Sequence, residues 1–78
     1  MKKWCKIIET EKHDVLIQRM STDEDGEHLT ISVKLEGVLA QFKPSFGDDE
    51  AFADEAFQKY SKEDAETLVK NTLEMFKG

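Results

Sequence analysis

The stretch that decides the fold is HLTISVKL, residues 28–35. Its apolar residues alternate strictly with polar ones, and a period of two is typical of a strand with one buried face and one wet face. The segment Val15–Met20 before it is also rich in strand-forming residues, and Ser21–Gly26 between the two ends in Asp-Gly, a tight-turn sequence. The sequence therefore predicts a hairpin with Ser21–Gly26 at its tip.

Two further strands flank this hairpin. Lys3–Thr10 is the predicted first strand, and Glu11–Asp14 forms its turn into the hairpin. On the other side, Glu36-Gly37 either makes a tight turn into a strand over Val38–Lys43 or forms a bulge within one long bent strand. We favour the turn, which gives a four-stranded antiparallel meander.

The hydrophobic period changes from two to about 3.6 near Pro44, and this change separates a strand-forming half from a helix-forming half. Pro44 has no amide hydrogen for a sheet ladder and Gly47 readily adopts a positive φ, so the sheet should end before them. Two helices should follow and cover one face of the sheet. The predicted class is α+β, with the order ββββαα.

Both helix starts carry capping residues. Asp48 or Asp49 can cap the first helix, and Ser61 with Asp64 three residues later resembles a capping box that begins the second. Apolar residues at helical spacing should face the sheet. They are Phe52, Ala53, Ala56, Phe57 and Tyr60 in the first helix, and Ala65, Leu68, Val69, Thr72, Leu73 and Phe76 in the second.

The chain length indicates one small domain. Its 78 residues are expected to form a single unit over 1–78, with the sheet in 1–43 and the two helices in 48–77. The hydrophobic share of 38% supports a core, although 36% of the residues are charged. A deep enzyme pocket is not expected at this size.

Metal and cofactor sites are not expected either. Zinc needs about four converging ligands, whereas this chain offers Cys5, His13 and His28 at no recognised spacing. We expect Cys5 to be half-buried in a strand, His13 to lie in a turn and His28 to be the exposed start of a strand. The acidic turn resembles a calcium loop only in part, because Ser32 stands where a bidentate glutamate is required.

The expected cellular compartment is inferred from features that the sequence does not have. The single cysteine cannot form an internal disulfide, and no apolar run approaches the roughly 18–20 residues of a membrane span. The first residues do not have the pattern of a signal peptide. A cytoplasmic location is therefore expected.

The charge of the chain argues against catalysis and against direct nucleic-acid binding. No glycine-rich phosphate loop or nucleophile with a neighbouring base is visible, and paired acids on an amphipathic helix should point into water. Nucleic-acid binding draws most of its affinity from Lys and Arg, and the net charge of −6 has the wrong sign. We expect a protein that is not an enzyme.

Negative charge gathers in two segments. Residues 21–27 hold four carboxylates with no Lys or Arg, and residues 48–66 hold eight against two lysines. Such a field attracts a basic protein surface and selects against acidic partners. The predicted binding residues, each an exposed anion, are Asp23, Glu24, Asp25, Asp48, Asp49, Glu50, Asp54 and Glu55.

The function hypothesis is a small acidic protein-binding module that regulates or inhibits a partner through its basic surface. A partner that normally holds nucleic acid would be occupied by mimicry, and small phage inhibitors of host machinery share this size and charge. The alternative is an uncharacterised structural domain whose acids serve only solubility.

Two further expectations concern apolar contacts. The chain could form a homodimer through an edge strand or the uncovered sheet face, although Lys3, Lys6 or Lys43 could discourage edge pairing. Phe46 should pin the first helix to the sheet, rather than act as an exposed anchor.

Overall fold

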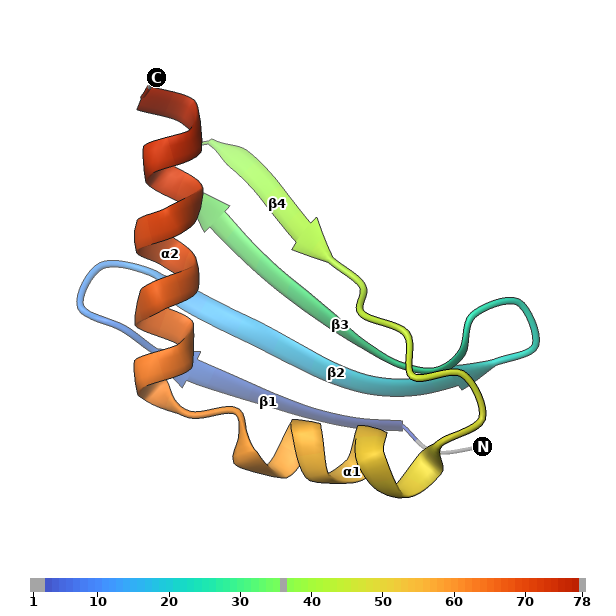
Figure 1. The fold of residues 1–78 in the computed structure, drawn as a ribbon. Helices are drawn as coiled ribbons and strands as arrows, with labels where there is room; N and C mark the ends of the chain where they lie inside the picture. Colours follow the sequence, from blue (N-terminus) through green and yellow to red (C-terminus); the bar gives the residue numbers. More distant parts are fainter. Residues whose placement is uncertain (1–2, 36, 78) are drawn as a thin grey trace.

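The computed structural model describes residues 3–35 and 37–77, with side chains for 4–35 and 37–75. Its elements in chain order are β1 (Lys3–Glu9), β2 (Asp14–Thr22), β3 (Gly26–Leu35), β4 (Val38–Phe42), α1 (Glu50–Lys59) and α2 (Lys62–Lys77). The strands form one antiparallel sheet in the order β1-β2-β3-β4, and both helices pack on it (Figure 1). The predicted ββββαα arrangement of the α+β class is confirmed.

The core lies between the sheet and the helices. Val15 pairs with Val33 and Ile17 pairs with Ile31, so these side chains share one face of the sheet. In Figure 1, α2 crosses the direction of the strands, whereas α1 runs along them. The buried apolar residues are Val15, Ile17, Leu29, Ile31, Val33, Leu35, Ala53, Phe57, Ala65 and Val69. Full burial of a large side chain of this kind contributes about 1.5–3 kcal/mol.

The predicted turns on either side of β3 are both present. Thr22 pairs with Gly26 across the first turn, so the two strands extend closer to the tip than expected. Leu35 pairs with Val38 across the second, which supports a tight turn rather than a bulge. Gly37 has a φ of +88°, a conformation that favours glycine. Glu36, the other residue of that turn, lies outside the described residues.

The helix starts follow the capping pattern. Asp49, rather than Asp48, is the N-cap of α1, and its Oδ1 accepts a hydrogen bond from the amide of Phe52 at 2.9 Å. At the start of α2, the amide of Ser61 donates to Asp64 at 3.0 Å, and the amide of Asp64 donates to the Ser61 hydroxyl at 3.3 Å. The capping box therefore closes even with the shorter aspartate side chain.

Phe52 does not belong to the core, contrary to the predicted stripe. It is 57% exposed, and its ring lies 5.0 Å from that of Phe46 between centroids. Phe46 is half-buried and packs against the core cluster, in agreement with the pinning role expected for it. The side chain of Phe76, which was placed in the stripe of α2, lies outside the described residues.

Two strand residues differ in burial from the expectation. His28 is 2% exposed rather than solvent-facing, and Ser45 of the loop after β4 pairs with it beside β3. Cys5 is exposed rather than half-buried, since it lies on the sheet face that the helices do not cover.

Lys6 points under the helices instead of guarding the sheet edge. Its ammonium group donates hydrogen bonds to the carbonyl oxygens of Phe57 and Tyr60, the latter at 3.0 Å, and lies 4.8 Å from the centre of the Phe57 ring. These carbonyls belong to the end of α1, where a cation is favourable. Burial lowers the pKa of Lys6.

Gly26 should be the glycine least able to accept a side chain. An added Cβ would lie 2.5 Å from the carbonyl oxygen of Gly47, and its φ of +67° is itself unfavourable for alanine. We expect Gly26→Ala to lower the free energy of unfolding by about 2–4 kcal/mol, measured by urea unfolding followed through Trp4 fluorescence.

Gly47→Ala is the matched control. Gly47 has nearly the same φ, +64°, but an added Cβ there meets no atom within 4 Å. We expect it to cost only about 1 kcal/mol of backbone strain. Equal losses in the two variants would show that the close approach of the two chain segments does not matter.

Candidate functional site

The two acidic segments meet at one end of the sheet. The amide of Glu27 donates to the carbonyl of Gly47 at 2.8 Å, and the amide of Phe46 donates to the carbonyl of Glu27 at 2.7 Å. The hydroxyl of Ser45 donates to the carbonyl of Asp25 at 2.6 Å. These bonds place the turn between β2 and β3 beside the loop that leads into α1 (Figure 1).

We call the resulting surface the acidic end, made of Asp23, Glu24, Asp25, Asp48, Asp49 and Glu50. Asp23 and Asp48, which are 25 positions apart in sequence, line the same surface hollow together with Glu27. The side chain of Asp25 is 38% exposed and forms an ion pair with Lys43 at 3.4 Å. Six of the eight predicted binding residues therefore share this end of the molecule, and apart from the half-buried Asp25 they are exposed.

Glu55 lies apart from the turn between β2 and β3. It follows the cap residue Asp49 by about a turn and a half of α1, and its carboxylate pairs with Lys59 on the same helix at 2.5 Å. Glu55 is exposed, as expected, but its charge is partly offset by this lysine.

Asp54 is a counterion rather than an exposed anion. Its side chain is 21% exposed, and its Oδ1 accepts a hydrogen bond from Nε of Arg19 at 3.0 Å. Arg19 itself is fully buried, and its other nitrogens donate to the carbonyl of Met20 and to Oε1 of Glu27. One guanidinium therefore joins β2, β3 and α1.

The pKa values of this cluster favour its charged state. A hydrogen bond from the hydroxyl of Ser21, followed by that from Arg19, lowers the pKa of Glu27. Burial alone would lower the pKa of Arg19, but hydrogen bonds to Glu27 and Asp54 outweigh it and raise that pKa. Arg19 and Glu27 therefore stay ionised at neutral pH.

Sequence reasoning missed Arg19, although a signal was present. In β2, Arg19 continues the inward-facing alternation of Val15 and Ile17. A charged residue in the apolar phase of a strand is buried only when it is paired. The position of Arg19 in β2 therefore indicated that a carboxylate from another part of the chain pairs with it.

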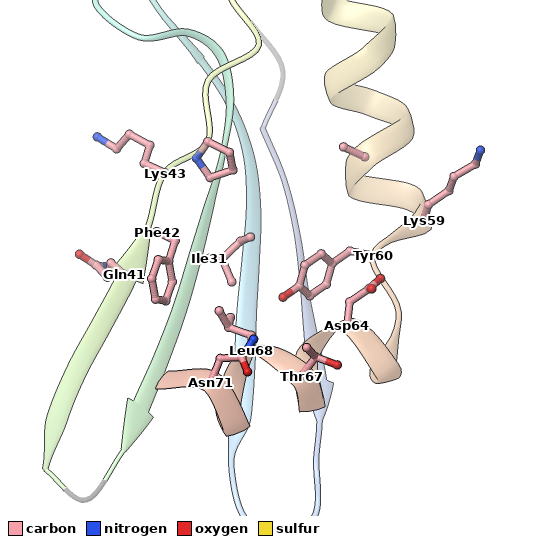
Figure 2. A pocket seen from close by; sticks show the side chains of 12 residues that line it. Ile31, Gln41, Phe42, Lys43, Lys59, Tyr60, Asp64, Thr67, Leu68 and Asn71 are labelled. Atoms are coloured by element: carbon pink, nitrogen blue, oxygen red, sulfur yellow. The ribbon is translucent and has the colours of Figure 1, made fainter. Parts of the chain in front are cut away.

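A second surface feature is a groove between β4 and the corner that joins α1 to α2. Figure 2 shows the Tyr60 ring directed into it, with Ile31 and Phe42 on the sheet side and Leu68 on the helix side. Burial, followed by the charge of Asp64, raises the pKa of Tyr60, so its hydroxyl stays protonated at neutral pH. The groove is an apolar surface with a polar rim.

Metal and membrane sites receive no support from the described part of the chain. Among those residues, no group of three or more His, Cys, Asp or Glu side chains could hold a metal ion. Nor does any helix in residues 3–35 and 37–77 have the length and apolar character needed to cross a membrane.

Comparison with known proteins found no match. No protein-family model fits the sequence, and neither a curated protein nor a solved structure shows significant similarity to it. Function must therefore be inferred from the residues and their arrangement.

Arg19→Met should destabilise the protein strongly, because it removes the cation shared by Glu27 and Asp54 while leaving both carboxylates in place. We expect a loss of about 3–5 kcal/mol in urea unfolding. Lys59→Met, which breaks the exposed pair with Glu55, should cost less than about 0.5 kcal/mol. Similar losses in the two variants would contradict the central role of Arg19.

Stability should also depend on the ionisation of Glu27. Because its folded pKa lies below the ordinary value of 4.5, its contribution is present above that pH and is lost as pH falls through the folded pKa. Glu27→Gln should therefore be less stable at neutral pH and should lose less additional stability than the wild type below pH 4.5.

The control for this pH series is Glu24→Gln, at the exposed tip of the same hairpin. Its unfolding free energy should follow that of the wild type across the acid range. Parallel curves for the wild type and Glu27→Gln would show that Glu27 gains nothing from Ser21 and Arg19.

Proposed function

We propose that this protein is a non-enzymatic binding module that uses the acidic end to engage a basic surface on another protein. The observation that carries the proposal is the meeting of two sequence-distant acidic segments on one surface, fixed by backbone hydrogen bonds between Glu27, Phe46 and Gly47. Acids that served solubility alone would have no need of this convergence.

The geometry suits electrostatic recognition. A concentrated anionic field speeds the encounter with a basic partner and disfavours acidic ones. The acidic end is carried by a closed hairpin turn and a capped helix start, so little conformational entropy would be lost on binding.

A regulatory or inhibitory role follows from the kind of partner that carries a strong basic surface. Many such surfaces bind the phosphate backbone of nucleic acids through Lys and Arg. A domain of 78 residues that presents several carboxylates together would occupy such a surface and block it. We therefore favour a nucleic-acid mimic of the kind found among phage inhibitors, acting in the cytoplasm.

The test should change the acidic end without disturbing the fold. Asp49 and Asp54 are left unchanged, because Asp49 caps α1 and Asp54 pairs with Arg19. We therefore choose the triple variant Asp23→Asn, Glu24→Gln and Asp48→Asn, whose three side chains are exposed. A matched control carries Glu63→Gln, Glu66→Gln and Glu74→Gln on the exposed side of α2.

Both triple variants raise the net charge of −6 by three units, so they differ only in where the charge is removed. In pull-downs from a lysate of the source cells, we expect partners retained by the wild type and the α2 variant to be lost by the acidic-end variant. Capture should also weaken as added salt shortens the screening length below about 8–10 Å. Equal capture by the two variants would mean that the acids serve solubility.

A further inference from the structure

The outer edge of β4 is unusual for this chain. Although 36% of the residues are charged, Val38–Phe42 contains no ionisable side chain. Edge strands of monomeric proteins are normally protected by charges, proline or a covering segment, because their backbone groups can pair with another strand. The other edge strand, β1, includes the charged residue Glu9 and is contacted by α2.

The pairing with β3 shows which backbone groups of β4 point outward. Leu35 and Val38 close a two-residue turn, and such a closing pair exchanges both of its backbone hydrogen bonds. Because hydrogen-bonded pairs alternate along an antiparallel ladder, Ala40 and Phe42 also direct their backbone groups to β3. Leu39 and Gln41 therefore direct theirs to the outer edge.

Apart from Gln41, the side chains along this edge are apolar. Val38 is 50% exposed and Leu39 is 60% exposed, on opposite faces of the strand. Phe42 is half-buried and forms the sheet side of the groove that Tyr60 enters from the helix corner (Figure 2). The chain beyond Phe42 continues beside β3 in the same antiparallel register, with Ser45 opposite His28.

We propose that β4 pairs with β4 of a second copy of this chain, antiparallel about a two-fold axis at Ala40, to form one continuous eight-stranded sheet. This register uses all five residues of the strand. Val38 lies opposite Phe42 of the second copy, Leu39 lies opposite its Gln41, and the two Ala40 residues face each other.

The strand is self-complementary in this register. The exposed Val38 of each copy reaches the mouth of the groove bounded by Phe42 in the other copy. The two-fold axis therefore produces two equivalent apolar contacts. The small side chain of Ala40 at the axis allows the two strands to approach closely. Leu39 and Gln41 supply the outward backbone donors and acceptors on both sides.

Charge also favours this arrangement. Lys43, the first charged residue after the strand, faces Gly37 of the second copy rather than another lysine. The acidic end follows the carboxyl end of β4, and the two strands run in opposite directions. The two acidic ends therefore lie at opposite ends of the seam, where their mutual repulsion is least.

The first test is the mass in solution, measured by sedimentation from micromolar to millimolar concentration. We expect the wild type to approach twice the chain mass of 9.0 kDa. Leu39→Lys should raise the dissociation constant at least about tenfold, because it places a charge on the seam. Ile7→Lys is the matched control, since Ile7 is 65% exposed on the same sheet face but lies on β1.

The second test addresses the register. In a Cys5→Ser background, Ala40→Cys should form an interchain disulfide rapidly under a mild oxidant, because directly opposed residues of a non-hydrogen-bonded pair have Cβ atoms about 4.5–5.5 Å apart. Val38→Cys is the control. It is the more exposed position, but it faces Phe42 and not its own copy, so it should link slowly.

The outcomes are distinct. The proposal is supported if the wild type is a dimer, Leu39→Lys dissociates it and Ile7→Lys does not. Rapid disulfide formation by Ala40→Cys would in addition support the register. A strict monomer at millimolar concentration overturns it, as does a dimer that responds to Ile7→Lys instead. Faster linking at Val38 than at Ala40 overturns the register. This inference does not depend on the proposed function of the acidic end.

Discussion

The buried guanidinium of Arg19 is the constraint on which much of this structure depends. A cation at 0% exposure beneath a helix is tolerable only if carboxylates and carbonyls satisfy it. Glu27 from β3 and Asp54 from α1 do so, together with the carbonyl of Met20. The position of α1 against the sheet is therefore set by an ion-pair geometry as well as by the burial of Ala53 and Phe57.

This constraint divides the acidic residues into two groups. Glu27 and Asp54 form ion pairs with the buried Arg19, and Asp49 caps α1. What remains at the acidic end is a smaller set of exposed carboxylates around Asp23 and Asp48. Any role in recognition belongs to this set, because acids that already hold the fold together are not available for a partner without a cost in stability.

The sequence predicted the fold well because its signals were local. Alternation over residues 28–35 and the turn residues around Gly26 are read within a few positions, as are the caps at Asp49 and Ser61. The pairing of Arg19 with Asp54 and that of His28 with Ser45 instead join segments far apart in the chain. Asp54 is 35 positions from Arg19, and Ser45 is 17 from His28, so no local pattern reports either contact.

The candidate site was predictable in composition but not in arrangement. The two acidic segments were evident in the sequence. Their meeting, however, depends on the bridge between Gly26 and Gly47. That bridge lies beyond Pro44, where the sheet was expected to end. Pro44 does lack an amide donor, but its carbonyl accepts a hydrogen bond from the amide of Leu29 at 3.1 Å. Proline removes one hydrogen-bond donor from a ladder and leaves the acceptor, so Pro44 did not prevent the loop after β4 from pairing with β3.

The same loop connects the two surfaces to which we assign binding. This loop runs from the carboxyl end of β4 to the acidic end. The uncharged edge of β4 and the acidic end are therefore neighbours along the chain. In an antiparallel pairing of two β4 strands, each acidic end would project from a different end of the seam. A partner with two basic sites at a matching distance would then bind both ends at once, and its apparent affinity would exceed that for one copy by the effective concentration of the second. Self-association through β4 would in this way strengthen recognition by charge, while the strand itself, residues 38–42, contributes no acid to the interface.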